Sequence, residues 1–517
     1  MDERVATAAR LLPDYLSQHV LLSAAALGLG LLISLPLVVA ASRNAKIRWP
    51  VLGFASVVQT VPSLALLALF YPLLLALSAA SKYLFGYGFS ALGFLPSLLA
   101  LTLYSMLPIL RNGVTGLLNV EPALIEAARG VGMTDRQRLF RVELPLAAPV
   151  LMAGIRTAAV WVIGAATLST PVGQTSLGNY IFSGLQVENW VSVLFGCGAA
   201  VILAIVTDQL LGLVESGVAR RVTRRVWIGV GLLLAGVAVA ASVQLAAGGK
   251  SSYVIGAKNF SEQYILADLI TDSLRKVGRA ATTRVDLGSV IAFRALASND
   301  IDAYVDYSGT VWANVMGRKD SLPREQMLEE MRTALRKDHG VVLLGALGFE
   351  NAYALAMRRD RAAELGIRSL ADLARQASEL AMGADFEFFS RPEWRALQKR
   401  YALNFRAQRQ FQPTFMYRAL ASREVDVISA FSSDGRIAAN DLVVLTDPLQ
   451  VIPPYDAILL ISPARGTDPV LRQALGPLVG AIPIELMRQA NYKVDRDTDK
   501  SSPGQAAEWL SNAAHIK

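Results

Sequence analysis

Side chains that could carry out covalent or metal chemistry are few in this sequence. It has one cysteine, Cys197, and three histidines, of which His339 and His515 lie in the more polar C-terminal half. A lone cysteine cannot form a disulfide within the chain, and we expect a buried thiol rather than part of a Cys/His metal site. No nucleophile with a neighbouring base suggests a catalytic centre. The sequence therefore predicts a protein that is not an enzyme and that holds no cofactor and no metal.

A basic segment, 121–146, lies between two apolar stretches. From Glu126 to Pro145 it reads EAARGVGMTDRQRLFRVELP. Its acidic residue and two alanines predict a short helix whose small side chains allow close approach to a partner. A glycine then permits a sharp turn, and a proline begins the next span, where it costs little. The residues that give the segment this pattern are Glu126, Ala127, Ala128, Gly132 and Pro145, and the family resemblance described below implies that they contact a partner.

Two simpler interpretations of this segment remain open. It can be an ordinary amphipathic loop between helices. Its arginines Arg136, Arg138 and Arg141 can fix the membrane topology, or they can also meet acidic residues of a partner.

The first half of the chain is apolar enough to cross a membrane several times. Hydrophobic residues make up 53% of the whole sequence, and they concentrate before residue 248. About 20 mostly apolar residues are needed to cross the hydrocarbon core. Pro62 and Pro72 predict a broken or re-entrant second span. The six predicted spans are approximately 20–41, 51–78, 90–110, 147–168, 190–214 and 227–247.

The basic residues predict how these spans are oriented. Lys and Arg gather in 42–50, 111–146 and 217–226, whereas 79–89 has only Lys82 and 169–189 has none. Because cytoplasmic loops are rich in Lys and Arg, we expect the N-terminus outside and segment 111–146 inside. The sixth span then returns the chain to the outside. No removable signal peptide is expected.

Charge adds little evidence for other partners. The formal net charge of +8 is partly explained by the membrane loops, and no basic-aromatic motif accompanies it, so no nucleic-acid partner is predicted.

Asp208 lies in the fifth span near its cytoplasmic end. Ionisable residues within spans are functional candidates, but this one can simply reach lipid headgroups or Arg220.

The second half of the chain has the pattern of a soluble α/β domain. After a polar junction at 247–252, short β-branched runs alternate with amphipathic helices such as 261–276, 324–337 and 470–489. Their number suits two lobes with a ligand cleft between them. We place lobe one at 253–344 plus 448–517 and lobe two at 349–446. The predicted strands are 253–257, 283–287, 303–307, 341–344, 352–357, 426–430, 443–445 and 457–461.

Both halves resemble parts of one family of transporters. The pattern from Glu126 through Val142 and Leu144 to Pro145 resembles the EAA loop of ABC-importer permeases, and Gln59–Leu69 and Arg156–Asn179 resemble the permeases of glycine betaine/choline/carnitine importers. The resemblance implies a permease domain at 1–216, whose EAA loop is a short helix pair docked on a cytoplasmic ATPase. It also implies that two copies pair, as a homodimer or with a related subunit. An extra span and tether occupy 217–249.

The domain at 250–517 resembles the binding proteins for compatible solutes with quaternary ammonium groups. A fused permease and binding protein is a known arrangement in this family. The chain has no GxxxxGK[ST] sequence, so ATP hydrolysis is expected from a separate subunit. The matching motifs are Gly256–Gln263, Tyr304–Thr310, Leu347–Tyr353, Glu387–Pro392, Ala430–Arg436, Pro453–Tyr455 and Asn491–Asp495.

This resemblance implies a ligand site made of aromatic faces. A trimethylammonium group has no N–H to donate and is attracted to aromatic rings. The aromatic candidates on matched motifs are Tyr307, Tyr353, Tyr417 and Tyr455. The polar candidates for the rest of the ligand are Gln263, Ser308 and Asn351. Each aromatic can instead be core, which we favour for Phe388 and Phe389, and Asp434 can pair with Arg436 near the hinge.

Asp456 departs from the family pattern, which has an aromatic or neutral polar residue after Pro-Pro-Tyr. In the cleft it would favour a ligand with a cationic or donor-bearing group, whereas facing solvent it would change nothing. The ligand therefore stays open between glycine betaine, choline, carnitine and larger trimethylated betaines such as ergothioneine.

The sequence thus predicts the permease and solute-binding subunit of an ATP-driven importer in the plasma (inner) membrane, surrounded by lipid. The alternatives are a non-transporting membrane receptor with a ligand-binding ectodomain, and an extracellular enzyme on a membrane anchor.

The charge pattern makes a topology prediction. In a Cys197→Ser background, a cysteine replacing Glu126 should be protected from a membrane-impermeant thiol reagent in intact cells, because we expect this residue inside. Protease should reach the region around Tyr353 from outside under the same conditions. Accessibility of Glu126 and Tyr353 from the same side would contradict this topology.

Overall fold

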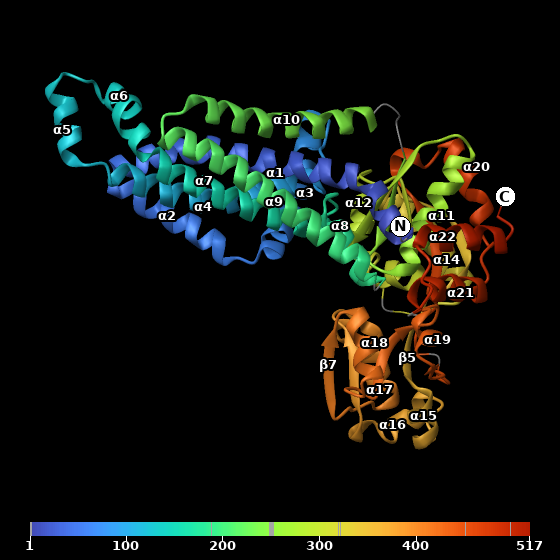
Figure 1. The fold of residues 1–517 in the computed structure, drawn as a ribbon. Coiled ribbons are helices and arrows are strands. Elements are labelled where there is room, and N and C mark those ends of the chain that lie inside the picture. Colours follow the sequence, from blue (N-terminus) through green and yellow to red (C-terminus); the bar gives the residue numbers. More distant parts are fainter. Residues whose placement is uncertain are drawn as a thin grey trace. The chain divides into compact units, whose positions relative to one another are not determined.

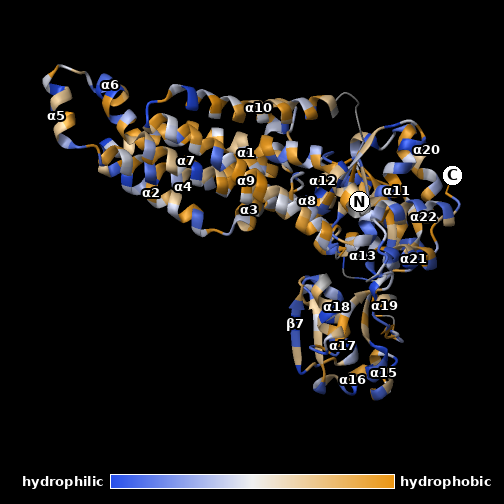
Figure 2. Cartoon of the chain, viewed as in Figure 1, coloured by the Kyte–Doolittle hydropathy of each residue, from blue (hydrophilic) through white to orange (hydrophobic). Residues whose placement is uncertain are grey.

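The chain folds into two compact units, which Figure 1 traces in sequence colours. The first comprises Met1–Ile181 with Val191–Lys250, and the second Phe182–Trp190 with Ser251–Lys517. Helices of the first unit are largely hydrophobic, whereas those of the second mix both kinds of residue (Figure 2). The computed structural model describes residues 3–187, 189–247, 253–318, 320, 322–449, 451–496 and 498–516.

Residues 3–247 are helical throughout most of their length. Six helical stretches are long and apolar enough to cross a membrane, which confirms the predicted number: Ala8–Arg43, Ser63–Phe85, Phe94–Leu118, Asp135–Val172, Trp190–Ala219 and Thr223–Ala246. The α-helices are α1 Glu3–Arg43, α2 Ala45–Thr60, α3 Ser63–Phe85, α4 Phe94–Leu118, α5 Pro122–Gly130, α6 Asp135–Arg138, α7 Leu144–Ala166, α8 Gly178–Gln186, α9 Trp190–Ala219 and α10 Thr223–Ala247.

The second span is broken, as its prolines predict, but its predicted limits of 51–78 are wrong. Helix α2 ends at Thr60 and α3 begins at Ser63, so the apolar span is α3 alone. Val61 is extended because the residue before a proline is pushed out of the helical region. The Tyr104 hydroxyl donates a hydrogen bond to the Val61 carbonyl, which satisfies one of the groups freed by the break.

The predicted docking segment forms the short helix pair α5 and α6, which projects from one end of the helical bundle (Figure 1). Gly132 between them has φ of +78°, a conformation that glycine adopts without strain. Glu126 and Ala127 are exposed, and Ala128 is buried. Pro145 lies in the first turn of α7.

Buried charges at the base of this helix pair are internally balanced. Glu143, in a π-helical turn at Leu139–Glu143, accepts hydrogen bonds from Arg138 at 2.7 Å and from Arg43 of α1 at 2.5 Å. Arg138 is only 5% exposed. It is therefore engaged within the chain, by Glu143 and by Asp135.

Two further expectations for the first unit are corrected. Asp208 pairs with Arg156 of α7 rather than with Arg220, accepting two hydrogen bonds from it at 3.0 and 2.7 Å. Arg156 also donates to Glu215 at 2.7 Å, so a charged residue within one span is balanced by a neighbouring span. Cys197 is free but only partly buried.

The second unit contains two five-stranded sheets, one in each lobe. The first has the order β2-β1-β3-β10-β4 and the second β7-β6-β8-β5-β9. In the first, β10 is antiparallel to its neighbours, whereas β1 is parallel to both β2 and β3. The strands are β1 Tyr253–Lys258, β2 Ala281–Leu287, β3 Ala303–Tyr307, β4 Val342–Glu350, β5 Tyr353–Arg358, β6 Ala381–Asp385, β7 Ala407–Phe411, β8 Val427–Phe431, β9 Leu442–Val444 and β10 Asp456–Ile461.

Helices cover both sheets. They are α11 Ser261–Lys276, α12 Ser289–Ala297, α13 Ser308–Thr310, α14 Arg324–His339, α15 Arg359–Leu365, α16 Leu370–Ala374, α17 Pro392–Tyr401, α18 Pro413–Ala421, α19 Arg436–Ala439, α20 Pro469–Leu475, α21 Ile484–Asp495 and α22 Pro503–Ala513. The predicted single helix at 470–489 is wrong, since α20 and α21 are separated by a turn with two prolines.

Strands β6 and β7 are absent from the prediction because their sequences lack the usual strand signal. Strand β6 reads AMGAD, without a β-branched residue, and β7 reads AQRQF, which is mostly polar. Strand β7 lies at the edge of its sheet, where polar side chains are tolerated. Pairing with β8 and β6, rather than local propensity, places these residues in the sheet.

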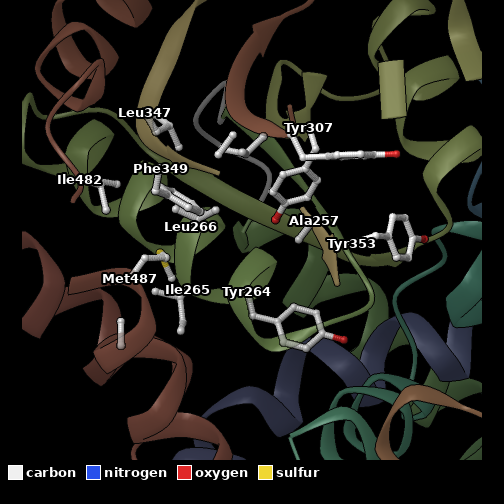
Figure 3. Close-up of a cluster of buried hydrophobic side chains, with 14 of the residues drawn as sticks. Ala257, Tyr264, Ile265, Leu266, Tyr307, Leu347, Phe349, Tyr353, Ile482 and Met487 are labelled. Atoms are coloured by element: carbon white, nitrogen blue, oxygen red, sulfur yellow. The ribbon is translucent and has the colours of Figure 1, made fainter. Parts of the chain in front are cut away.

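The hydrophobic core of the second unit reaches the end of β3 and the start of β5. Figure 3 shows Tyr307 and Tyr353 beside the buried residues of α11, including Tyr264, Ile265 and Leu266. Tyr307 is 4% exposed and Tyr353 is 7% exposed. Their backbones are thus held by core packing at the point where the two strands meet the space between the lobes.

A close contact between helices α7 and α4 in the first unit makes a stability prediction. A Cβ at Gly154 of α7 would lie 2.6 Å from the Pro108 carbonyl oxygen of α4, whereas a Cβ at Gly164 on the same helix would meet nothing within 4 Å. Gly154→Ala should therefore lower stability by about 1–3 kcal/mol through overpacking, while Gly164→Ala should be neutral or slightly stabilising. Thermal unfolding midpoints of the two purified variants in detergent compare them directly. Equal midpoints would contradict this close contact.

Candidate functional site

The second unit contains a cavity lined by both lobes, and the ends of strands position its walls. Strands β1 and β3 are next to each other and parallel, so their carboxyl ends open at the same edge, where ligands bind in sheets of this kind. Strand β1 leads through Phe260 into α11, and β3 ends at Tyr307. The lobe-two wall comes from the residues after β6 and at the end of β8. The lining residues used below are Phe260, Glu262, Tyr307, Asn351, Tyr353, Asp385, Arg391, Phe431, Asp434, Arg436, Tyr455, Asn491 and Asp495.

Five aromatic rings form a continuous wall of this cavity. Phe260 stacks on Phe431 with ring centroids 6.3 Å apart and on Tyr307 at 6.1 Å. Tyr353 contacts Phe431 at 4.8 Å and Tyr455 at 5.8 Å, edge to face. Phe260 and Phe431 were not predicted as site residues, although both lie within the sequence motifs used to identify the site. An apolar ring carries no polar tip, so sequence alone did not separate them from the core.

Four of the seven predicted ligand residues line the cavity, namely Tyr307, Asn351, Tyr353 and Tyr455. The other three lie behind it. Gln263 accepts a hydrogen bond from the Lys258 amide at 3.2 Å and donates to the Tyr307 hydroxyl at 3.1 Å. Ser308 donates to the Pro454 carbonyl at 3.1 Å and accepts from the Asp456 amide at 2.9 Å.

Tyr417 supports a charged pair rather than the cavity surface. It is 2% exposed and donates to Asp434 at 2.7 Å, and the Arg436 guanidinium lies 4.3 Å from its ring centroid. Arg436 donates to Asp434 at 3.0 and 2.7 Å, which confirms the predicted pair. Phe388 is fully buried against Trp394, in agreement with its predicted core role.

Among the described residues, each cationic side chain that lines the cavity has a buried carboxylate partner. Lys258 pairs with Asp306, Arg436 with Asp434, and Arg391 with Glu393 at 3.1 Å. Arg391 also lies over the Tyr353 ring, 4.9 Å from its centroid, and donates to the Tyr455 hydroxyl at 3.0 Å. These pairs cancel the positive charge of the wall and hold two of the tyrosines in place.

The remaining acidic groups make the cavity rich in hydrogen-bond acceptors. Among the described residues, Glu262, Asp385 and Asp495 form no ion pair. Burial raises the pKa of Asp385. The backbone amides of Glu387 and Phe388 donate hydrogen bonds to this carboxyl group and lower its pKa, but burial has the larger effect. Burial also raises the pKa of Glu262 and raises that of Asp495 to about 7. The cavity therefore offers aromatic faces together with buried carboxyl groups whose pKa values are raised.

Asp456 does not add its charge to this cavity. Its carboxylate forms an ion pair of 3.0 Å with Arg324, which also pairs with Glu350 at 2.8 Å. Asp456 is 7% exposed, so it faces neither the cleft nor open solvent. The departure from the family pattern is compensated by an arginine from α14.

The raised pKa of Asp495 makes a prediction for the pH dependence of stability. The folded protein holds this proton up to about pH 7, whereas the unfolded chain releases it near the ordinary pKa of 3.8. Stability from this group is complete below about pH 4 and is lost as pH rises to about 7, with a slope of at most about 1.4 kcal/mol per pH unit. Asp495→Asn should flatten that slope in urea-unfolding curves, whereas Asp338→Asn, an exposed change on α14, should keep it. An unchanged slope in Asp495→Asn would contradict the assignment.

Comparison with known proteins matches each unit to a family of transporter components. Residues 251–512 match the family described as "Substrate binding domain of ABC-type glycine betaine transport system". Residues 29–226 match the "Binding-protein-dependent transport system inner membrane component" family.

Individual relatives show the same two parts, alone or fused. The chain is 28% identical to "Ergothioneine transport permease/ergothioneine binding protein EgtU" of Helicobacter pylori (strain G27), over 87% of this chain and 81% of that protein. It is 41% identical to "Glycine betaine/carnitine/choline transport system permease protein OpuCB" of Bacillus subtilis (strain 168), over 38% of this chain and 84% of the relative. It is also 41% identical to "Osmoprotectant import permease protein OsmW" of Salmonella typhimurium, over 38% of this chain and 85% of the relative.

These matches agree with six membrane-spanning helices followed by a two-lobed α/β domain. The chain therefore belongs to the glycine betaine and osmoprotectant family of ABC importers, as a multi-pass inner-membrane permease fused to its extracytoplasmic substrate-binding domain.

Proposed function

We propose that this protein captures a small quaternary ammonium solute in the cavity of its second unit and passes it through its permease domain. The observation that carries the proposal is the aromatic wall of Phe260, Tyr307, Tyr353, Phe431 and Tyr455 in a cavity whose cations are all neutralised. A trimethylammonium group is attracted to such faces by about 0.5–2 kcal/mol per ring. Among the described residues that line the cavity, each arginine or lysine is paired with a carboxylate, so no unneutralised cation repels the solute.

The seven predicted ligand residues take two roles in this proposal. Tyr307, Asn351, Tyr353 and Tyr455 touch the solute. Gln263, Ser308 and Tyr417 hold these side chains and Arg436 in position through the hydrogen bonds and ring contact described above.

The domain organisation follows the same proposal. Residues 1–216 form the permease, 217–249 the extra span and tether, and 250–517 the binding domain, with lobes at 253–344 plus 448–517 and at 349–446. Two permease copies pair around the translocation path, because one copy of this size supplies only part of the helices around a pore.

A separate ATPase powers transport through the helix pair α5 and α6. Glu126 and Ala127 are exposed there, together with the large apolar side chains of Leu124, Val131 and Phe140. Exposed apolar residues grouped with charged ones are typical of a protein interface. Gly132 fixes the turn between α5 and α6, and Pro145 fixes the start of α7. A displacement of α5 by the ATPase is therefore transmitted to a membrane span.

Glycine betaine, choline and carnitine are the first candidates for the solute, because the binding-domain family and the permease relatives carry these names. Ergothioneine is the second candidate, and one observation favours it. The relative that shares the fusion and aligns with 87% of this chain is named for ergothioneine.

The aromatic wall predicts how one substitution affects binding. Tyr353→Leu keeps apolar volume but removes a ring, so it should weaken binding of the quaternary ammonium solute by about 2- to 30-fold. Tyr353→Phe keeps the ring and should bind as tightly as the unaltered protein, since no hydrogen bond of the Tyr353 hydroxyl is seen among the described residues.

Isothermal titration calorimetry of the full chain in lipid nanodiscs, with glycine betaine, choline, carnitine and ergothioneine as ligands, measures these affinities. Failure of all four to bind the unaltered protein would overturn the proposed function. Equal affinities of the leucine and phenylalanine variants would remove Tyr353 from the site.

A further inference from the structure

Glu262 is the centre of a buried hydrogen-bond network beside the aromatic wall. It lies in the first turn of α11 and is 3% exposed. One carboxylate oxygen accepts from the Tyr307 hydroxyl at 2.6 Å and from Asn351 Nδ2 at 3.1 Å. The other accepts from Ser433 Oγ at 2.6 Å and from Asn491 Nδ2 at 2.7 Å. Four donors from four separate segments therefore converge on one carboxylate.

This network fixes which way the two asparagine amides point. Each amide turns its NH2 group towards a Glu262 oxygen, to which it donates, and therefore turns its own oxygen away. The Asn491 NH2 is fixed a second time, because it also donates to the Ser433 carbonyl at 2.7 Å. Flipping either amide would place an oxygen against the Glu262 oxygens, which repel it.

Both amide oxygens are consequently buried acceptors without a partner. Asn351 is 5% exposed and Asn491 is 1% exposed, and both line the cavity. Among the described residues, neither Oδ1 atom accepts a hydrogen bond. Arg436 Nη1 is a buried donor in the same cavity wall, and it donates a hydrogen bond to neither of these amide oxygens. A buried polar atom left unpaired costs a factor of about 5 to 150 in an equilibrium constant.

We infer that Asn351 and Asn491 determine specificity by accepting a hydrogen bond from the solute. The inference rests on the proposed function and narrows it: the solute carries an O–H or N–H group in addition to its quaternary ammonium group. Glu262 is the positioning residue that aims the two amide oxygens. A betaine without any donor leaves both acceptors unpaired when the lobes enclose it, and water is excluded from their place.

Matched ligand pairs test this inference on the full chain in lipid nanodiscs. The pairs are carnitine with γ-butyrobetaine, which lacks only the hydroxyl, choline with its O-methyl ether, and ergothioneine with a derivative methylated on both ring nitrogens. For the pair that fits the cavity, the donor-bearing member should bind at least about 10-fold more tightly, because sites built to bond a donor reject analogues without it. Calorimetry gives the ratio of the two dissociation constants.

Variants assign the preference to the named residues. Asn351→Ala and Asn491→Ala should each reduce the ratio towards one, and Glu262→Gln should reduce it as well, since its new NH2 group opposes the donors that face it. Asn404→Ala removes an exposed asparagine that does not line the cavity and should leave the ratio unchanged. The ratio within a pair is insensitive to a general loss of affinity, so it separates specificity from damage to the fold.

The outcomes are distinct. Binding of both members of a pair with equal affinity to the unaltered protein overturns the inference and leaves the proposed function intact. A preference that persists in both alanine variants also overturns it. Failure of every trimethylammonium compound to bind overturns the proposed function and the inference together.

Discussion

A charge held away from water must find a partner within the protein, and this constraint shapes both units. Desolvating a single ion costs several kcal/mol unless opposite charge and hydrogen bonds replace the water. Glu143 forms ion pairs with two arginines at the base of helices α5 and α6. Asp208 forms an ion pair with Arg156 between two spans. In the binding unit the same rule neutralises every cation of the cavity wall.

That neutralisation decides what the cavity can hold. With Arg391 and Arg436 already paired, the wall presents ring faces and oxygen atoms rather than free positive charge. Aromatic rings attract a cation without forming directional hydrogen bonds, so they suit a group that has no N–H to donate. The buried carboxylate of Glu262 then orders the polar part of the wall, because its four donors leave the amide oxygens of Asn351 and Asn491 facing the other way.

The permease half obeys a different constraint, which is close packing between helices in a solvent as apolar as their own side chains. Gly154 lets α7 approach α4 to backbone contact, and α7 is the helix that continues directly from the docking segment. The charged clusters at Glu143 and Arg156 tie the same helix to α1 and α9.

The sequence by itself determined the class and order of the elements, because hydrophobic length, charge bias and strand or helix periodicity are local properties. It identified the six spans, the docking segment at Glu126 and most strands of the two sheets. Only the tertiary structure decided the partner of Asp208, the place of Asp456 against Arg324, the two strands β6 and β7, and the entry of Phe260 and Phe431 into the cavity wall. Each of these depends on contact between residues distant in the chain, and no local pattern specifies which distant side chain will be the neighbour.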